Sequence, residues 1–299
     1  MHRENAGPRA LAGGSSFYLG CAVWGYKGWM GRLFPHGTKP SEYLTLYSRH
    51  MKAVEGNTTF YGVPDRETIV RWTQQTPPEF RFCMKLPRWI THQGLFENIP
   101  KAISDARSFV EQMKALEGRA GPYFLQLPPQ YDPSRLDELR VFLEAFPRDE
   151  ARLLVEVRHK AFFQAPYHGR LLDLLIRLGI GRVLLDSRPM YEGEGYAPMI
   201  LDPRKPNLPL CPEVTAPFSL VRFVSHPEAH INRPYFEHWV KLCEAFLKQG
   251  TAVYFFMHCP EETFSPDNAA IFHRMLLEAK LAVPALPWCS PKNDQLKLF

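Results

Sequence analysis

Eight short segments rich in apolar residues recur along almost the whole chain, and this repetition constrains the fold more than any other feature. They cover residues 18–23, 53–58, 80–85, 123–127, 153–158, 182–186, 218–224 and 252–259. Most are separated by stretches with helical periodicity, which indicates repeated strand–helix units rather than hairpins. Eight such units are the number found in a closed (β/α)8 barrel. We therefore predict an α/β fold of the TIM-barrel class.

Apolar residues at helical spacing predict the connecting helices. Asp132-Pro133 and Ser265-Pro266 each supply a capping side chain followed by a proline that suits the first helical turn. The strongest stripe lies between the last two segments and comprises Phe236, Trp239, Val240, Cys243, Phe246 and Leu247. We interpret these stripes as the surfaces that pack on the strands.

The alternation of strands and helices continues without a break in composition, which predicts one domain over residues 17–283. Residues 1–16 are polar and rich in glycine and alanine, so we expect a disordered N-terminal tail. Residues 284–299 are expected to form an extended C-terminal tail. Residues 187–217 are proline-rich and lack a helical period, which predicts a long irregular sixth crossover. This loop would either cover a site or be a simple excursion.

Composition limits the classes of protein that are possible. The net charge of +5 permits an anionic partner without demonstrating one. The six cysteines lack the spacing of a zinc site or a disulfide framework, which favours reduced thiols in a cytoplasmic protein. No apolar stretch has the length of a membrane span, so we expect no membrane partner. P-loop, HExxH and GxSxG motifs are absent from the sequence.

Polar and ionisable residues mark the ends of the apolar segments. Because strand side chains alternate, Glu55 shares a face with Asn57, and Glu156 shares one with Arg158. Strand ends meet at one mouth of a barrel, where we expect these side chains to converge with Lys85, Gln126 and Asp186. Three carboxylates beside two cations suit general acid–base catalysis or one divalent metal ion. The alternative is a buried ion-pair network that only ties strands together.

The segments after the predicted strands carry aromatic and basic residues. Aromatic faces interleaved with cations bind stacked bases or sugar rings that bear phosphates, although large aromatics also cap barrels without binding a ligand. The eleven histidines show no spacing that requires a metal, and His258, at the end of the eighth segment, is the best single candidate.

Several stretches of the chain resemble the family called domain of unknown function 72, or YecE-like. The matching stretches are residues 20–26 with Trp29, 54–61, 82–85 with Thr91 and His92, 126–129, and 155–159. Together they extend over most of residues 17–280. The resemblance implies a TIM barrel with an unassigned activity. Likeness of such barrels to metal-dependent endonucleases and sugar isomerases suggests both kinds of reaction by analogy of fold alone.

The chain departs from the pattern of this family at two strand ends. After the seventh strand, where the family usually has an Arg-x-His-Gly-like segment, this chain has Ser225 and His226 following Arg222. The eighth strand, which usually ends in Phe-Asn-Asn, here ends in Phe256, Met257 and His258. A divergent specificity or a weakened activity would follow from these changes.

The last five residues form a second, independent motif. Gln295, Leu296, Leu298 and Phe299 resemble the Gln-Leu-x-Leu-Phe peptide with which bacterial replication and repair proteins bind the sliding clamp. Leu298 and Phe299 would fill an apolar pocket while Gln295 forms a hydrogen bond at its rim. The alternative is that this end packs on the barrel or has no role.

These observations lead to three hypotheses. We favour a metal-dependent phosphodiesterase or endonuclease-like enzyme linked to DNA metabolism, with nucleic acid or a phosphorylated small molecule as its partner. The second hypothesis is a sugar or sugar-phosphate isomerase or hydrolase, and the third is a DNA-associated binding module without catalysis. The candidate catalytic residues are Glu55, Lys85, Glu156 and Asp186. The candidate ligands for one divalent metal ion are Glu55, Glu156, Asp186 and His258. The candidate substrate-binding residues are Trp24, Tyr26, Asn57, Tyr61, His92, Gln126, Arg158, His159 and Arg222.

Overall fold

The computed structural model describes residues 17–192 and 206–287, which form a nearly closed barrel of parallel strands. The strands are β1 (Phe17–Cys21), β2 (Ala53–Gly56), β3 (Arg81–Met84), β4 (Tyr123–Gln126), β5 (Leu153–Glu156), β6 (Gly181–Asp186), β7 (Phe218–Val224) and β8 (Ala252–His258). They form an 8-stranded sheet in the order β3-β2-β1-β8-β7-β6-β5-β4. The predicted α/β barrel is confirmed.

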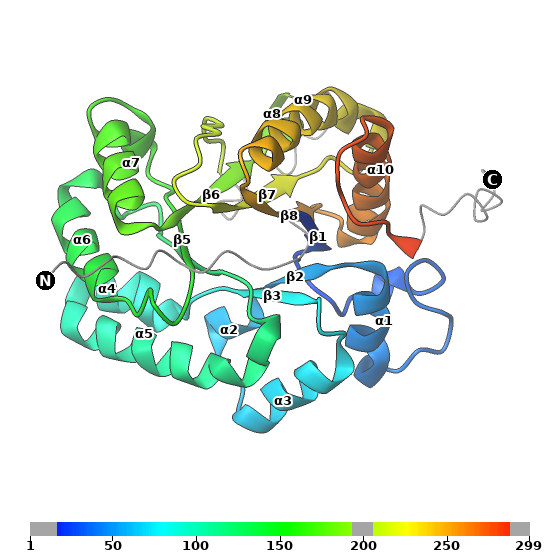
Figure 1. Ribbon diagram of the computed structural model, residues 1–299, viewed down its shortest axis with the longest axis horizontal. Coiled ribbons are helices and arrows are strands. Elements are labelled where there is room, and N and C mark those ends of the chain that lie inside the picture. The colour runs from blue at the N-terminus through cyan, green and yellow to red at the C-terminus, as the bar shows by residue number, and fades with distance from the viewer. Residues whose placement is uncertain (1–16, 193–205, 288–299) are drawn as a thin grey trace, which may run out of the picture.

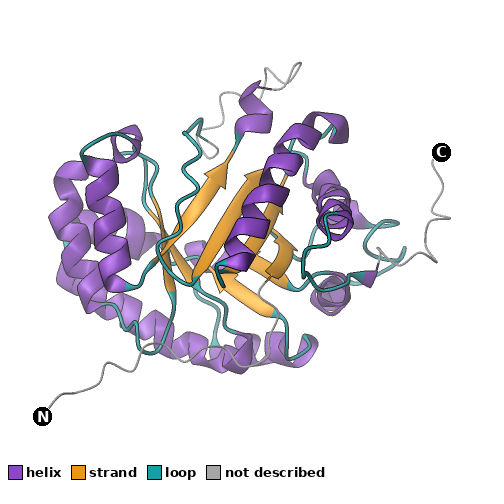
Figure 2. Cartoon of the chain, turned by 45° about the horizontal axis from the view of Figure 1, so that its top comes forward, coloured by secondary structure: helices purple, strands orange, loops and turns teal. Residues whose placement is uncertain are grey.

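Helices surround the strands, as Figures 1 and 2 show. They are α1 (Tyr43–His50), α2 (Thr58–Tyr61), α3 (Arg66–Gln75), α4 (Leu95–Glu97), α5 (Ile99–Met113), α6 (Leu136–Ala145), α7 (Tyr167–Leu178), α8 (Arg188–Glu192), α9 (Ala229–Lys248) and α10 (Ser265–Glu278). In α9 the predicted stripe is buried through Phe236, Trp239 and Cys243, and Trp239 packs edge-on against Phe255 of β8 at 5.4 Å. Burial of such aromatic surface stabilises the barrel wall.

β3 and β4, which close the barrel, are paired less extensively than the other neighbouring strands; we call this pair the β3–β4 seam. There the strands meet only through isolated bridges, and the backbone N–H of Leu86 donates to the carbonyl oxygen of Phe124 at 2.9 Å. The N–H of Gly121 donates to the carbonyl oxygen of Phe82 at the same distance, 2.9 Å. These bonds bring Lys85 of the β3 end beside Gln126 of β4, so the seam positions part of the mouth.

Side-chain alternation divides the barrel interior into an apolar lower part and a polar upper part. Tyr18 and Tyr254 stack at 4.7 Å between ring centroids within the lower part. Its members are Tyr18, Ala53, Cys83, Phe124, Leu154, Val183, Phe218, Leu220, Tyr254 and Phe256. One step further along the same strand faces come Glu55, Lys85 and Arg222. The apolar part therefore supports a polar layer at the carboxyl ends of the strands.

The sixth crossover differs in part from the prediction of an irregular loop. It begins with the short helix α8, and Leu208 beyond it is buried. Residues 193–205 lie outside the described residues, as do the predicted N-terminal tail and most of the predicted C-terminal tail. The packed domain extends past residue 283, its predicted end. Leu286 is buried, and His273 Nε2 lies 2.7 Å from the carbonyl oxygen of Pro284.

Gly20 tests the packing of β1 against β2. A Cβ atom at this position would overlap the carbonyl oxygen of Ala53, a backbone atom that no side-chain rotation can move away. We expect Gly20→Ala to lower the free energy of unfolding by roughly 3 kcal/mol. The control is Gly169→Ala in α7, where a Cβ meets nothing within 4 Å, and a gain of about 0.5 kcal/mol is expected. Denaturant unfolding measures both, and equal stability of the two variants would contradict the close approach.

Candidate active site

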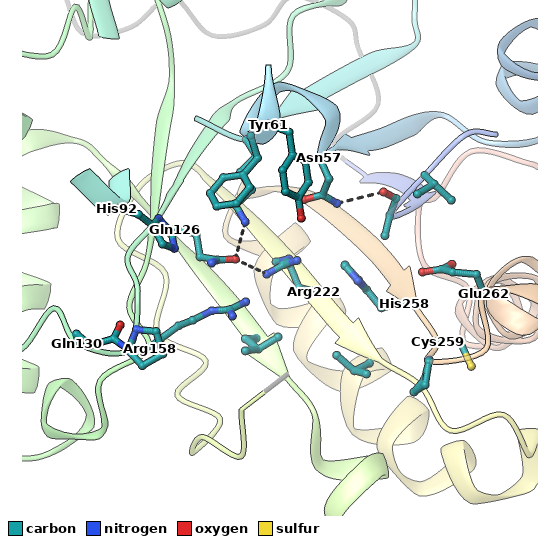
Figure 3. Close-up of a pocket in the computed structure, with 18 residues that line it drawn as sticks. Asn57, Tyr61, His92, Gln126, Gln130, Arg158, Arg222, His258, Cys259 and Glu262 are labelled. Carbon is teal, nitrogen blue, oxygen red and sulfur yellow. Dashed lines mark hydrogen bonds between the residues drawn. The ribbon is translucent and has the colours of Figure 1, made fainter. Parts of the chain in front are cut away.

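A cavity of about 570 Å³ opens at the carboxyl ends of the strands. Figure 3 shows its lining side chains converging from several strands and loops. Its polar and ionisable lining residues are Asn57, Tyr61, Lys85, His92, Gln126, Gln130, Arg158, Arg222, His258, Cys259 and Glu262. This is the face on which TIM-barrel enzymes carry their active sites.

Arg222 of β7 lies at the base of this cavity between two buried carboxylates. Its Nε and Nη2 donate to the two carboxylate oxygens of Glu55 at 2.9 and 3.0 Å. Its Nη1 donates to Oε2 of Glu156 at 2.7 Å. The two carboxylates come from β2 and β5, and both are almost completely buried. One guanidinium thus joins three strands that are far apart in the sequence.

Further side chains donate hydrogen bonds to the same two carboxylates. Arg158 Nε donates to Glu156 Oε1 at 2.7 Å. Asn57 donates to Glu55 Oε1 at 2.8 Å, and His258 Nε2 lies 2.9 Å from Glu55 Oε2. Each of the four carboxylate oxygens therefore accepts at least one hydrogen bond from a protein side chain.

The electrostatics of this cluster keep both carboxylates ionised. Burial alone would raise the pKa of Glu55, but the charges of Arg222 and His258 more than offset burial and hold this pKa well below its usual range. Burial likewise opposes ionisation of Glu156, yet Arg222 and Arg158 lower its pKa to about 2. The predicted ion-pair network is therefore present, and it forms the base of the cavity.

The predicted metal ligands do not fit a divalent ion in this arrangement. The guanidinium of Arg222 separates Glu55 from Glu156, and a cation already neutralises each of them. The fourth candidate ligand, His258, directs Nε2 at Glu55 rather than at a shared centre. Carboxylates that are already paired with arginine offer little to a metal ion.

The predicted convergence of Asp186 on the same cavity is wrong. On β6 the inward positions are Val183 and Leu185, so Asp186 lies on the opposite face of the strand, toward the helices. Its carboxylate accepts two hydrogen bonds from the Arg188 side chain, at 2.9 and 2.8 Å, and one from Trp239 Nε1 at 2.7 Å. Asp186 thereby anchors α8 and α9 to the barrel.

The upper wall of the cavity carries Lys85 and His92. Lys85 Nζ donates to Gln126 Oε1 at 3.0 Å and lies 3.7 Å above the centre of the Phe60 ring. Burial, and then the charge of Arg222, lowers the pKa of Lys85 to about 7. Burial, and then the charge of Lys85, lowers the pKa of His92 to about 4, so this imidazole is neutral at pH 7.

The aromatic loops contribute less to the cavity than predicted. Tyr61 lines it, but Trp24 packs edge-on against Trp72 and Tyr26 against Trp29, and neither is a lining residue. His159 accepts a hydrogen bond from the backbone N–H of Ala161 at the start of a short helical turn. The other predicted substrate-binding residues all line the cavity.

Sequence reasoning did not select Phe60, Cys259 and Glu262 as site residues, although all three line the cavity. Phe60 directly precedes Tyr61 in the segment after β2, which was a usable signal. Cys259 and Glu262 follow β8 within four residues, so the rule that strand ends carry the site could have found them.

The two departures from the family pattern have different positions. Ser225 donates to the carbonyl oxygen of His258 at 2.7 Å and accepts from Asn268 at 2.9 Å, which ties β7 to β8 and α10. The backbone N–H of His226 donates to Asn232 of α9 at 2.7 Å. Met257 is buried in the core around the barrel, whereas His258 faces the cavity.

A second group of metal-type ligands lies elsewhere, at His168, Cys211 and Glu213. Their ligand atoms are within 4.8 Å of one another. However, Nη1 of the buried Arg182 lies 3.1 Å from His168 Nε2 and 3.5 Å from Glu213 Oε2. This group already encloses a cation, so we do not assign a metal to it.

Together, the barrel and the polar mouth define a TIM-barrel protein with a cavity lined by basic residues at the carboxyl ends of its strands. The chain belongs to the DUF72 family, a family of proteins of unknown function, whose sequence profile matches residues 18–292.

Named relatives and solved structures agree with this assignment. The YecE protein of Escherichia coli K12 is 34% identical over 276 residues, which cover 90% of this chain and 97% of that protein. YunF of Bacillus subtilis is 23% identical over 62% of this chain and 64% of its own length. A crystal structure of a DUF72 family protein from Thermotoga maritima has a TM-score of 0.67 at 23% identity, covering 87% of this chain and 99% of that one.

Among the described residues, every helix is too short or too polar to cross a membrane.

Substitution of Arg222 tests the ion-pair network at the base of the cavity. Arg222→Met would leave Glu55 and Glu156 buried with reduced compensation, and we expect a loss of roughly 3–5 kcal/mol in the free energy of unfolding. The deficit should shrink as the pH falls, because protonation removes the uncompensated charges. Denaturant unfolding at pH 5 and pH 8 measures this change.

The control for this variant adds Glu55→Gln and Glu156→Gln to Arg222→Met. Removing all three charges should restore part of the lost stability, since no ionised carboxylate remains buried and the amide introduced at position 156 keeps an acceptor for Arg158. A triple variant that is less stable than Arg222→Met would contradict the assigned pairing.

Proposed function

We propose that this protein is an enzyme that acts on a small phosphorylated substrate, with a sugar phosphate as the best-fitting class. The observation that carries the proposal is the side chain of Arg158. Its Nε is bound to Glu156, whereas its two terminal nitrogens make no hydrogen bond within the described part of the chain, and Arg158 lines the cavity. A guanidinium fork of this kind suits the oxygens of a phosphate.

The charge distribution of the cavity supports the same class of substrate. Three basic side chains, Lys85, Arg158 and Arg222, line the cavity, and the charges of Glu55 and Glu156 beneath it are paired with the two arginines. Figure 3 shows Arg158 and His92 at one end of the cavity and Glu262 at the other. A substrate with a phosphate at one end and hydroxyl groups at the other matches this polarity.

Size and lining fit a sugar phosphate. A volume of about 570 Å³ lies within the range typical of small-molecule sites. The amides of Asn57 and Gln126 are suited to hydroxyl groups, and the exposed ring of Tyr61 can stack on a sugar ring.

Two side chains are suited to proton transfer in such a substrate. The pKa of Lys85, near 7, matches the pH at which a general acid or base is most effective. His92 is neutral, and the tautomer with hydrogen on Nδ1 donates to Thr91 Oγ1 at 2.7 Å and leaves Nε2 as a base. An isomerase or lyase that moves a proton on the carbon next to a carbonyl group would use side chains of this kind.

The metal-dependent phosphodiesterase or endonuclease, which the sequence alone favoured, becomes the less favoured proposal. Its carboxylates are paired with arginines and Asp186 lies outside the cavity, so its metal has no evident ligands among the described residues. A DNA-binding module without catalysis would use the same basic mouth, and the binding experiment below separates it from an enzyme of small molecules.

Arg158→Gln tests the phosphate proposal. Ribose 5-phosphate, glucose 6-phosphate and their unphosphorylated sugars are compared by thermal unfolding, and we expect only phosphorylated compounds to raise the midpoint. This increase should be lost in Arg158→Gln and retained in Arg170→Gln, which removes an exposed arginine of α7. If no phosphorylated compound stabilises the protein, while salt-sensitive retention on DNA is observed, the nucleic-acid proposals are favoured instead.

We also propose that the C-terminal tail binds a bacterial sliding clamp. The motif residues Gln295, Leu296, Leu298 and Phe299 lie outside the described residues, so the proposal rests on sequence alone. An apolar pair preceded by a glutamine is the pattern that a short peptide needs to dock into an apolar pocket.

A peptide of residues 290–299 is the appropriate probe of this interaction. It should bind the clamp in a calorimetric titration, and Phe299→Ala should weaken binding by more than about tenfold, since a buried aromatic anchor carries much of the energy of such contacts. Equal binding by the two peptides would rule out the assigned anchor.

A further inference from the structure

Lys85 is the amine that the barrel presents to the cavity at the β3–β4 seam. It follows β3 directly, and only 7% of the residue is exposed. Its Nζ contacts the neutral oxygen of Gln126 and the face of the Phe60 ring. Within the described residues, no carboxylate oxygen lies within salt-bridge distance of this nitrogen. The amine is therefore held without an anionic partner.

Cations crowd the same amine. Arg222 Nη1 lies 3.4 Å from the Gln126 oxygen that also accepts from Lys85, so two cations share one neutral acceptor. The charged and titratable groups that act on Lys85 from the surrounding elements are Arg222, Arg158, Glu156, Glu55 and His92. Burial and the two arginines outweigh the two carboxylates, which lowers the pKa of Lys85 to about 7. A substantial fraction of the amine is then neutral at physiological pH, and a neutral amine is a nucleophile.

We infer that Lys85 Nζ forms an imine with the aldehyde or ketone carbon of a small anionic substrate. This inference rests on the proposed function, because it names the carbonyl compound that the phosphate-binding cavity would take. Arg158 would hold the anionic group, and the Phe60 ring shields the amine from water on one side.

The chemistry requires no oxidant or reductant. The Nζ lone pair forms a C–N bond at the carbonyl carbon, and the π electron pair moves to oxygen. One proton passes from nitrogen to that oxygen through His92, which gives a carbinolamine. The oxygen then takes a second proton, from solvent, and leaves as water while the nitrogen lone pair forms the C=N bond. Neutral amine, carbonyl and one proton thus yield a protonated imine and water.

Reductive trapping tests this inference on the full-length wild-type protein. Dihydroxyacetone phosphate or pyruvate is added with sodium cyanoborohydride, which transfers hydride to an imine and fixes it as a secondary amine. Peptide mass spectrometry then locates the adduct. We expect labelling of Lys85 at pH 7 to exceed that of the exposed Lys160 by more than about tenfold, because an ordinary lysine is almost entirely protonated there.

The pH profile is a second readout that needs no variant. The neutral fraction of the amine grows as pH rises through its pKa, so labelling of Lys85 should increase with a midpoint near 7. Lys85→Arg should remove the dominant adduct, while Lys160→Arg should leave it in place.

The outcomes separate this inference from the proposed function. Labelling of Lys85 no faster than that of Lys160 overturns the imine, even if sugar phosphates still stabilise the protein. Dominant labelling of Lys85 by pyruvate supports the imine, even if no phosphorylated compound binds and the phosphate proposal fails.

Discussion

The pairing of Arg222 with both oxygens of Glu55, and with Glu156, is the contact on which the barrel mouth depends. Three charged groups lie almost out of water, and each alone would be costly to bury. Together they satisfy one another, and Arg158, Asn57 and His258 complete the hydrogen bonds of the carboxylates. Because the participants come from β2, β5 and β7, the network fixes the positions of strands on opposite sides of the barrel. It can exist only when the barrel is nearly closed.

This network also determines the properties of the groups above it. Arg222 competes with Lys85 for the oxygen of Gln126, and its charge contributes to the low pKa of Lys85. Lys85 in turn lowers the pKa of His92. The base of the cavity is therefore structural and strongly charged, whereas its upper wall carries an amine and an imidazole that are both available in neutral form. A single site thus combines a rigid ionic support with groups suited to proton transfer and nucleophilic attack.

The sequence-based interpretation was most successful where the chemistry follows from strand periodicity. Glu55 and Glu156 occupy inward positions of strands whose alternation is visible in the sequence, and both bind Arg222, which lines the cavity above them. The same reasoning gave a wrong prediction for Asp186, because the polarity of a residue does not reveal on which side of β6 it lies. Trp24 and Tyr26 failed because a loop has no fixed period, so their rings could pack on neighbouring aromatics instead of lining the mouth.

Strand–helix periodicity was enough to predict the barrel, and short motifs were enough to place the chain in the DUF72 family. These properties depend on local periodicity and on motifs that lie close together in the chain. The folded barrel was needed to show that Glu55 and Glu156 bind a guanidinium, and that Lys85 has no carboxylate partner among the described residues. The physical reason is that pairing and pKa depend on distances between groups from different strands, and those distances are fixed only when the barrel forms.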